Sequence, residues 1–144
     1  MATQRPRPKL PAPLRWLLAI DLFVGVTAVL GGVGLVADPS GRNVGLSLSM
    51  LEHSPFDTFL VPGLVLAVVI GGAALLASLA HLLRWRFAGQ ASLFAGLLLV
   101  GWILVQVLMI RELSWLHGVY FVLGLGQIAL ALRALGLASP RAAG

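Results

Sequence analysis

Ionisable side chains gather at one point of this sequence. The segment "LEHSPFDTFLVPGLVL", residues 51–66, places Glu52, His53 and Asp57 at the start of a long apolar run, and His117 lies near the start of another. Histidine and carboxylate are zinc ligands and groups that transfer protons in catalysis. Their spacing here matches no metal-binding motif. We therefore predict no metal and no catalytic residue, and keep a membrane enzyme with an outer-face site at these four residues as an alternative.

Asp21 is the acidic residue that stands within an apolar segment rather than beside one. An ionisable group inside a membrane span costs free energy, so its presence there indicates a function and a polar partner. Counting about 1.5 Å per helical residue brings Asp21 and Arg133 to a similar depth. We predict that they pair, or that the carboxylate reaches the interface near Arg15. A proton- or cation-binding site and a contact with a partner subunit are the alternatives.

Two glutamines, Gln106 and Gln127, also lie within apolar segments. Each amide needs hydrogen-bond partners in lipid, where a bond between helices contributes about 0.6–2 kcal/mol. We predict that both form hydrogen bonds in the core. The alternative is a ligand pocket lined by the two glutamines and by Trp102, which stands one turn before Gln106 on the same helix face.

Other patterns exclude several kinds of site. The chain has no cysteine, which rules out disulfides, thiolate nucleophiles and Cys-based zinc or iron–sulfur sites. The glycines of residues 31–34 lie inside an apolar run, so they indicate helix packing rather than a phosphate-binding loop. The small residues Gly63, Ala67 and Gly71 indicate tight packing within one bundle, with self-association or a partner's helix as the alternative. We predict no cofactor.

Membrane helices must position these side chains. Of the 144 residues, 59% are apolar and 10% are charged, and the mean hydropathy is +0.98, far from the balance of a soluble domain. Four segments, 16–36, 59–83, 87–110 and 113–136, are long enough to cross a hydrocarbon core of about 30 Å. Their backbone groups must be paired in lipid, so we predict an all-α, up-down-up-down four-helix bundle that forms a single membrane domain over residues 1–144.

The basic residues predict the orientation of this bundle. Only Arg42 and Arg111 lie in the first and third loops. The other eight lie at the termini or in the second loop: Arg5, Arg7, Lys9, Arg15, Arg84, Arg86, Arg133 and Arg141. By the positive-inside rule, both termini are cytoplasmic and the protein is a multi-pass protein of the cytoplasmic (inner) membrane. Because topology accounts for the positive charge, we predict no nucleic-acid partner.

The first outer loop, residues 37–58, is the one long connection. Ser54 begins a Ser-x-x-acid capping box, and Pro55 stands at the first helical position. We therefore predict a helix from Ser54 that lies along the interface, bends near Pro62 and caps the outer end of the bundle. The preceding "NVGLSLSM", residues 43–50, alternates apolar and small residues, which is typical of a short extended stretch.

The span count, the chain length and the "SPF…PG" pattern before the second span resemble those of uncharacterised small bacterial membrane proteins with four spans. No functional residues come with that resemblance. The chain is also similar to the small multidrug transporter family, which has four short helices and an acidic residue in the first, here Asp21. It departs from that family in its longer first loop and its strong basic bias.

These features favour a non-enzymatic accessory or interaction protein of the cytoplasmic membrane. Its expected partners are the lipid bilayer, other membrane subunits or a second copy of the chain. The first alternative is a small transporter or ligand-binding membrane protein that uses Asp21 and the polar groups in the bundle. The second is the membrane enzyme with an outer-face site.

Overall fold

The computed structural model describes residues 8–136, and these residues are mostly helical. They include no strand, which confirms the all-α prediction. The helices are α1 (Ala12–Ala37), α2 (Leu60–Leu64), α3 (Gly72–Leu82), α4 (Ala88–Ile110) and α5 (Trp115–Ala134), with a π-helical segment, η3 (Val65–Gly71), that joins α2 to α3. Three basic residues used to predict the orientation, Arg5, Arg7 and Arg141, lie outside the described residues.

Four helical stretches are long and apolar enough to cross a membrane. They are Ala12–Ala37, Leu60–Leu82, Ala88–Ile110 and Trp115–Ala134. These bounds follow the four predicted segments closely, because a continuous run of apolar residues in lipid has to satisfy its backbone hydrogen bonds within itself. Their length and composition are those of a multi-pass membrane protein built as a helical bundle.

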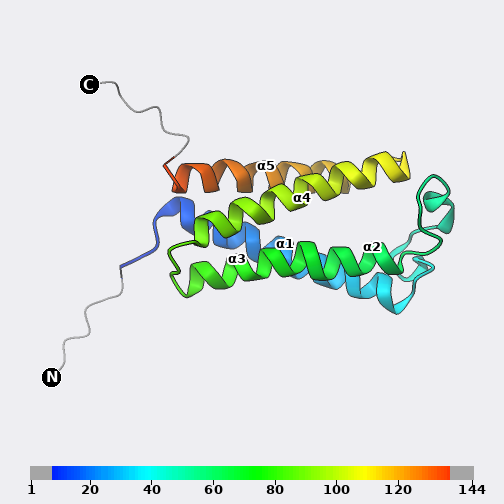
Figure 1. Ribbon diagram of the computed structural model, residues 1–144, viewed down its shortest axis with the longest axis horizontal. Helices are drawn as coiled ribbons and strands as arrows, with labels where there is room; N and C mark the ends of the chain where they lie inside the picture. The colour runs from blue at the N-terminus through cyan, green and yellow to red at the C-terminus, as the bar shows by residue number, and fades with distance from the viewer. Residues whose placement is uncertain (1–7, 137–144) are drawn as a thin grey trace.

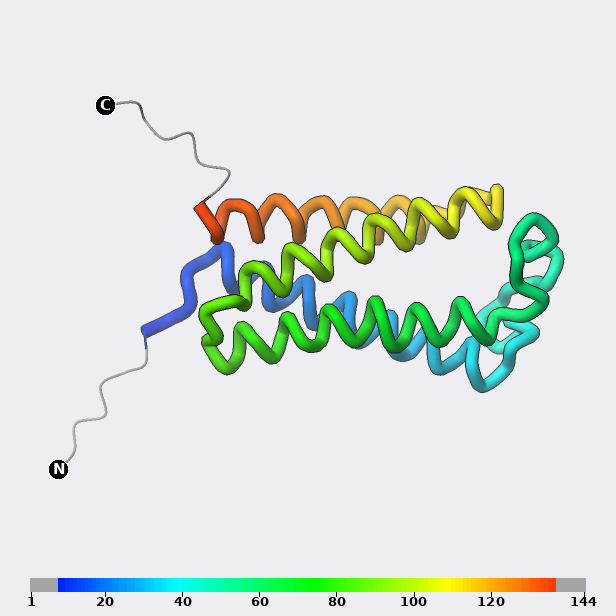
Figure 2. The backbone as a smooth tube through the Cα atoms, in the orientation of Figure 1, coloured from blue at the N-terminus to red at the C-terminus, as the bar shows by residue number. Residues whose placement is uncertain are grey.

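The helices lie lengthwise beside one another (Figures 1 and 2). The start of α1, the connection from α3 to α4 and the end of α5 lie together at what we call the terminal end. Residues 38–59 and 111–114 lie at the opposite end, the loop end. α1 packs along the α2–η3–α3 helix, α4 packs against α3 and α5, and α5 returns to α1. Toward the loop end, the α4–α5 pair separates from α1 and α2 (Figure 1).

Small residues bring α1 against the second helix. A Cβ atom added to Gly32 would lie 2.5 Å from the carbonyl oxygen of Gly63 and 2.6 Å from the Cβ of Ala67. One added to Gly71 would lie 2.6 Å from the side chain of Val29. The predicted small-residue ladder therefore packs within the bundle, against α1.

The helix predicted from Ser54 is wrong. Residues 54–59 are irregular, and α2 begins at Leu60. The Ser54 hydroxyl accepts a hydrogen bond from the Phe56 N–H at 3.2 Å, so it stabilises a local turn instead of the start of a helix. The predicted bend at Pro62 stays a prediction. The irregularity found in this helix is η3, and π-helical segments often occur at functional sites.

Tertiary contacts hold the first loop in its irregular path. Phe59 is only 2% exposed and packs with Leu35 of α1 and Leu51 of the loop. Its N–H donates to the Pro39 carbonyl at 2.8 Å. An α-helical start before Leu60 would have to give up this pairing of the two ends of the loop.

The extended stretch predicted at residues 43–50 is also wrong. The loop instead contains two 3₁₀ turns, η1 (Arg42–Val44) and η2 (Leu48–Leu51). Gly41 and Gly45, on either side of η1, have φ angles of 78° and 74°, which favour glycine. These two positions turn the chain too sharply for an extended strand.

Candidate functional site

Four polar side chains meet in the core near the terminal end, one from each long helical stretch. Asp21 of α1 and Ser92 of α4 are fully buried, as is Gln127 of α5, and His81 of α3 is 2% exposed. The Ser92 hydroxyl lies 2.5 Å from Oδ2 of Asp21, and Gln127 donates its side-chain amide N–H to Oδ1. Nε2 of His81 lies 2.7 Å from the Ser92 oxygen and 3.6 Å from Oδ2 of Asp21. We call these four residues the polar cluster.

Close helix packing positions the polar cluster. Gly96 stands one turn after Ser92, and a Cβ there would lie 3.3 Å from the Cβ of Gln127. The neighbouring turns carry buried small residues, including Ala77 and Ala131. Small side chains let the helix axes approach until short polar groups such as the Ser92 hydroxyl can reach across.

The predicted Asp21–Arg133 pair is wrong. Arg133 is exposed, and among the described residues the one ion-pair contact of Asp21 is with His81. The alternative in which the carboxylate reaches the interface near Arg15 is wrong as well, because Asp21 is fully buried. Asp21 contacts α5 at Gln127, whereas Arg133 stands six residues farther along α5, about 9 Å nearer the terminal end, and is exposed.

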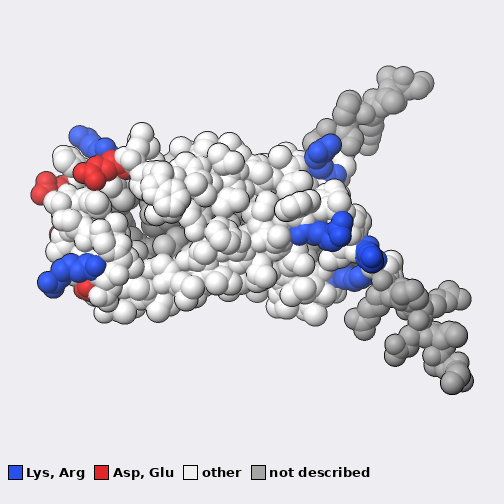
Figure 3. All heavy atoms as spheres, turned by 180° about the vertical axis from the view of Figure 1, so that it is seen from behind, with Lys and Arg blue, Asp and Glu red and all other residues white. Residues whose placement is uncertain are grey.

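A cavity of about 390 Å³ lies in the half of the bundle nearer the loop end. Its wall is mostly apolar and comes from α1, η3, α4, α5 and the first loop, for example Val24, Leu66, Ile70 and Met50. Its volume falls within the roughly 300–1,000 Å³ typical of small-molecule pockets. Figure 3 shows the surface hollowed on this side, beside the charged residues of the loop end.

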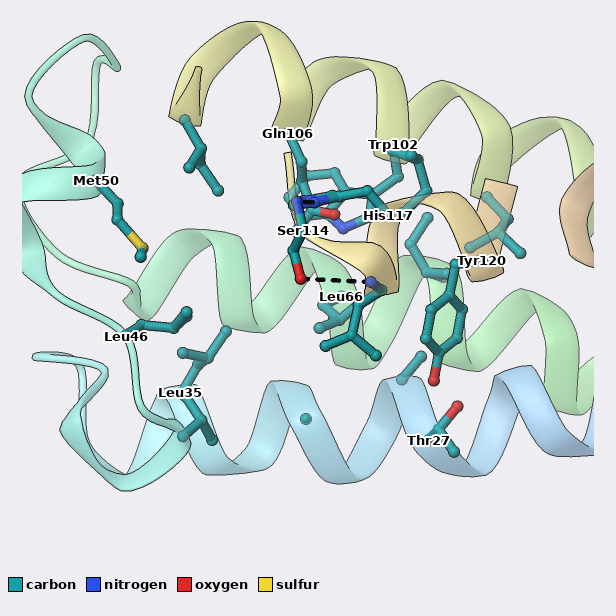
Figure 4. A pocket seen from close by; sticks show the side chains of 18 of the residues that line it. Thr27, Leu35, Leu46, Met50, Leu66, Trp102, Gln106, Ser114, His117 and Tyr120 are labelled. Atoms are coloured by element: carbon teal, nitrogen blue, oxygen red, sulfur yellow. Dashed lines mark hydrogen bonds between the residues drawn. The ribbon is translucent and has the colours of Figure 1, made fainter. Parts of the chain in front are cut away.

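A few polar groups face this cavity. Trp102, Gln106, His117 and Tyr120 line it, and Figure 4 shows them on α4 and α5 opposite Leu66 and α1. The indole N–H of Trp102 is buried and has no hydrogen-bond partner among residues 8–136. Trp102 and Gln106 therefore line one cavity, as in the ligand-pocket alternative, whereas Gln127 lies in the polar cluster and forms the predicted core hydrogen bond. The side-chain oxygen of Gln127 also lacks a partner among those residues.

The candidate outer-face residues do not form a metal site. In the described part of the chain, no group of three or more His, Asp and Glu side chains is arranged to hold a metal ion. Glu52, His53 and Asp57 are exposed on the first loop. His117 instead accepts a hydrogen bond at Nδ1 from the Ser114 N–H, 3.1 Å away, in the cap of α5.

Another acidic residue, Asp38, organises the first loop. Its carboxylate accepts hydrogen bonds from the hydroxyl of Ser40 at 2.6 Å and from the Asn43 N–H at 3.3 Å. The Ser40 hydroxyl, followed by weaker contributions from backbone N–H groups and Arg42, holds the pKa of Asp38 below its ordinary value. Asp38 thus ties the end of α1 to η1.

Sequence reasoning did not identify His81 or Ser92 as site residues. His81 is an ionisable group inside the second apolar segment, and the rule that singled out Asp21 applies equally to it. Ser92 has no such signal, because serine is common in membrane helices and often bonds its own backbone. No protein-family model, curated protein or solved structure matches this chain.

Proposed function

We propose that this protein is a non-enzymatic, ligand-binding membrane protein. Its ligand is a mainly apolar molecule that carries a hydrogen-bond acceptor such as an ester carbonyl. The cavity near the loop end accepts the apolar body, and donors on α4 and α5 bind the acceptor.

The unpartnered indole N–H of Trp102 carries this proposal. A buried donor without a partner costs about 1–3 kcal/mol, so proteins pair such groups unless a ligand or water does. Trp102 lines the cavity together with the amide of Gln106 and the phenol of Tyr120, which can both donate hydrogen bonds. An apolar wall with a few convergent donors is the usual composition of a small-molecule site.

The charge distribution supports an orientation for this cavity. On the face shown in Figure 3, the described residues of the terminal end include basic side chains and no acidic ones. The loop end carries both basic and acidic side chains. By the positive-inside rule, the terminal end is cytoplasmic in the inner membrane. The four spans then cross the membrane in alternating directions, as an up-down-up-down bundle. Residues 38–59 then cap the outer end, and the cavity lies in the outer half of the bilayer.

The expectation of an accessory subunit stays a prediction beside this proposal. Many apolar side chains on the bundle surface are exposed, for example Leu108 at 77%. In a membrane protein such side chains face lipid as readily as a partner helix. The cavity gives the protein an activity of its own that needs no partner subunit.

Photolabelling tests the proposal directly. The protein would be reconstituted in liposomes with a photoactivatable diacylglycerol, a neutral acyl ester, and the labelled peptides would be mapped. We expect labelling of α4 and α5 at cavity-lining positions and competition by unlabelled diacylglycerol. Trp102→Phe keeps the ring and removes the N–H, so apparent affinity should fall roughly fivefold for a bond of about 1 kcal/mol.

Trp85→Phe is the matched control. Trp85 is 43% exposed and lies at the terminal end, away from the cavity, so the same chemical change there should leave labelling unaltered. Labelling confined to surface positions such as Leu108, and equal in the two variants, would contradict ligand binding in the cavity.

A further inference from the structure

We infer that Asp21, Ser92 and His81 form a buried site for a single proton, which moves between carboxylate and imidazole through the serine hydroxyl. This site is separate from the cavity and does not rest on the proposed function. Each of the four helical stretches contributes one side chain to the polar cluster, and none of the four side chains is more than 2% exposed.

Charge balance sets the number of protons. An uncompensated ion in the protein interior costs several kcal/mol, so the cluster is favoured when it is neutral. Facing Asp21, α3 supplies the ionisable His81, whereas α4 and α5 supply the neutral Ser92 and Gln127. The basic residues of the terminal end are exposed, and none of those described forms an ion pair with Asp21: Lys9, Arg15, Arg84, Arg86 and Arg133. One proton on the Asp21–His81 pair makes the cluster neutral, none leaves it negative, and two make it positive.

The serine hydroxyl gives that proton two positions. In the first, Nε2–H of protonated His81 donates to the Ser92 oxygen, and the Ser92 hydroxyl donates to the ionised Oδ2 of Asp21. In the second, Oδ2–H donates to the Ser92 oxygen, and the hydroxyl donates to Nε2 of neutral His81. The two states differ by a shift of one proton along each hydrogen bond, so no atom or charge is gained or lost.

Gln127 fixes which carboxylate oxygen takes part. Its amide N–H donates to Oδ1 of Asp21, and that oxygen remains an acceptor in both states. The proton therefore binds to Oδ2, the oxygen that faces Ser92. The side chains thus form a preformed path from α1 through α4 to α3.

Infrared difference spectroscopy tests this inference on the whole protein in liposomes. A change between mildly acidic and mildly alkaline pH should alter the carbonyl band of a buried protonated carboxyl group, and isotope labelling of the aspartate carboxyl should shift that band. Asp21→Asn should abolish it, because the amide imitates the protonated carboxyl group but cannot titrate. Asp57→Asn, which changes an exposed carboxylate, should preserve it.

A second measurement separates proton sharing from a merely structural hydrogen bond. In a His53→Gln, His117→Gln protein, His81 is the last histidine, and its NMR signal should titrate together with the carboxyl band. Ser92→Ala should separate the two titrations. The inference is overturned if wild-type protein shows no aspartate band, if Ser92→Ala leaves the titrations coincident, or if the band follows sodium concentration at constant pH, which would indicate a cation site.

Discussion

Gly32→Ala is the most direct test of the contact that sets the spacing of α1 and the second helix. The added methyl group would lie 2.5 Å from the carbonyl oxygen of Gly63 and 2.6 Å from both the N and the Cβ of Ala67. Cβ atoms essentially never lie closer than 3.0 Å to a non-bonded atom, so the two helices have to separate by about 0.5 Å.

No atom near Gly32 can move away from the added methyl group without a large cost in free energy. The atoms in the way belong to the backbone and to a Cβ, and none of them can rotate aside as a long side chain would. Overpacking of this kind costs about 1–3 kcal/mol. Separation would also shift Leu66 and Ile70, which project from η3 into the cavity.

Thermal unfolding of the protein in mild detergent would measure this cost. The matched control is Gly101→Ala in α4, where an added Cβ meets nothing within 4 Å. We expect Gly32→Ala to unfold at a clearly lower temperature than the wild type, and Gly101→Ala to match or exceed the wild type because alanine is the better helix former. Equal midpoints for the two variants would refute the close α1–α2 contact.

Three further predictions concern the loop end and the orientation. The hydrogen bond from Ser40 holds the pKa of Asp38 below its ordinary value. The ionised carboxylate therefore stabilises the fold above the ordinary pKa, and this stabilisation is lost as pH falls through the lowered pKa. The free energy of unfolding, measured across acidic pH, should show this loss in the wild type and not in Asp38→Asn. Ser114→Ala removes the N-cap of α5 and should lower the free energy of unfolding by about 1 kcal/mol in a detergent denaturation series, so an unchanged value would contradict the cap. An impermeant maleimide should label Arg42→Cys on intact cells and Arg86→Cys only after permeabilisation, and the reverse pattern would overturn the orientation.

The presence of the four membrane-spanning helices could be predicted from the local sequence. Four uninterrupted apolar segments determine four helices, since lipid offers the backbone no other partner. The start of the second helix could not be predicted in this way. Ser54 and Pro55 satisfy a local capping rule, but burial of Phe59 against Leu35 outweighs the one or two hydrogen bonds of a cap.

The sequence also determined that Asp21 is unusual, because its residue type and its place in an apolar run are both local facts. Its partners were decided by tertiary structure. Counting residues gives depth along a helix, and depth alone made Arg133 a candidate. Which side of each helix turns inward depends on how the small residues of all four helices pack together. That packing brings Ser92, His81 and Gln127 to the carboxylate and leaves Arg133 exposed.

For the cavity, too, the sequence determined one part and the tertiary structure another. The sequence places Trp102 and Gln106 one turn apart on one helix face, so their association was predictable from periodicity alone. The space before them exists because α4 and α5 separate from α1 and α2 toward the loop end (Figure 1), and no local pattern encodes that separation. Residue type and periodicity therefore determined which groups could act, and the relative positions of the helices decided which groups meet, because those positions arise from contacts between residues far apart in the chain.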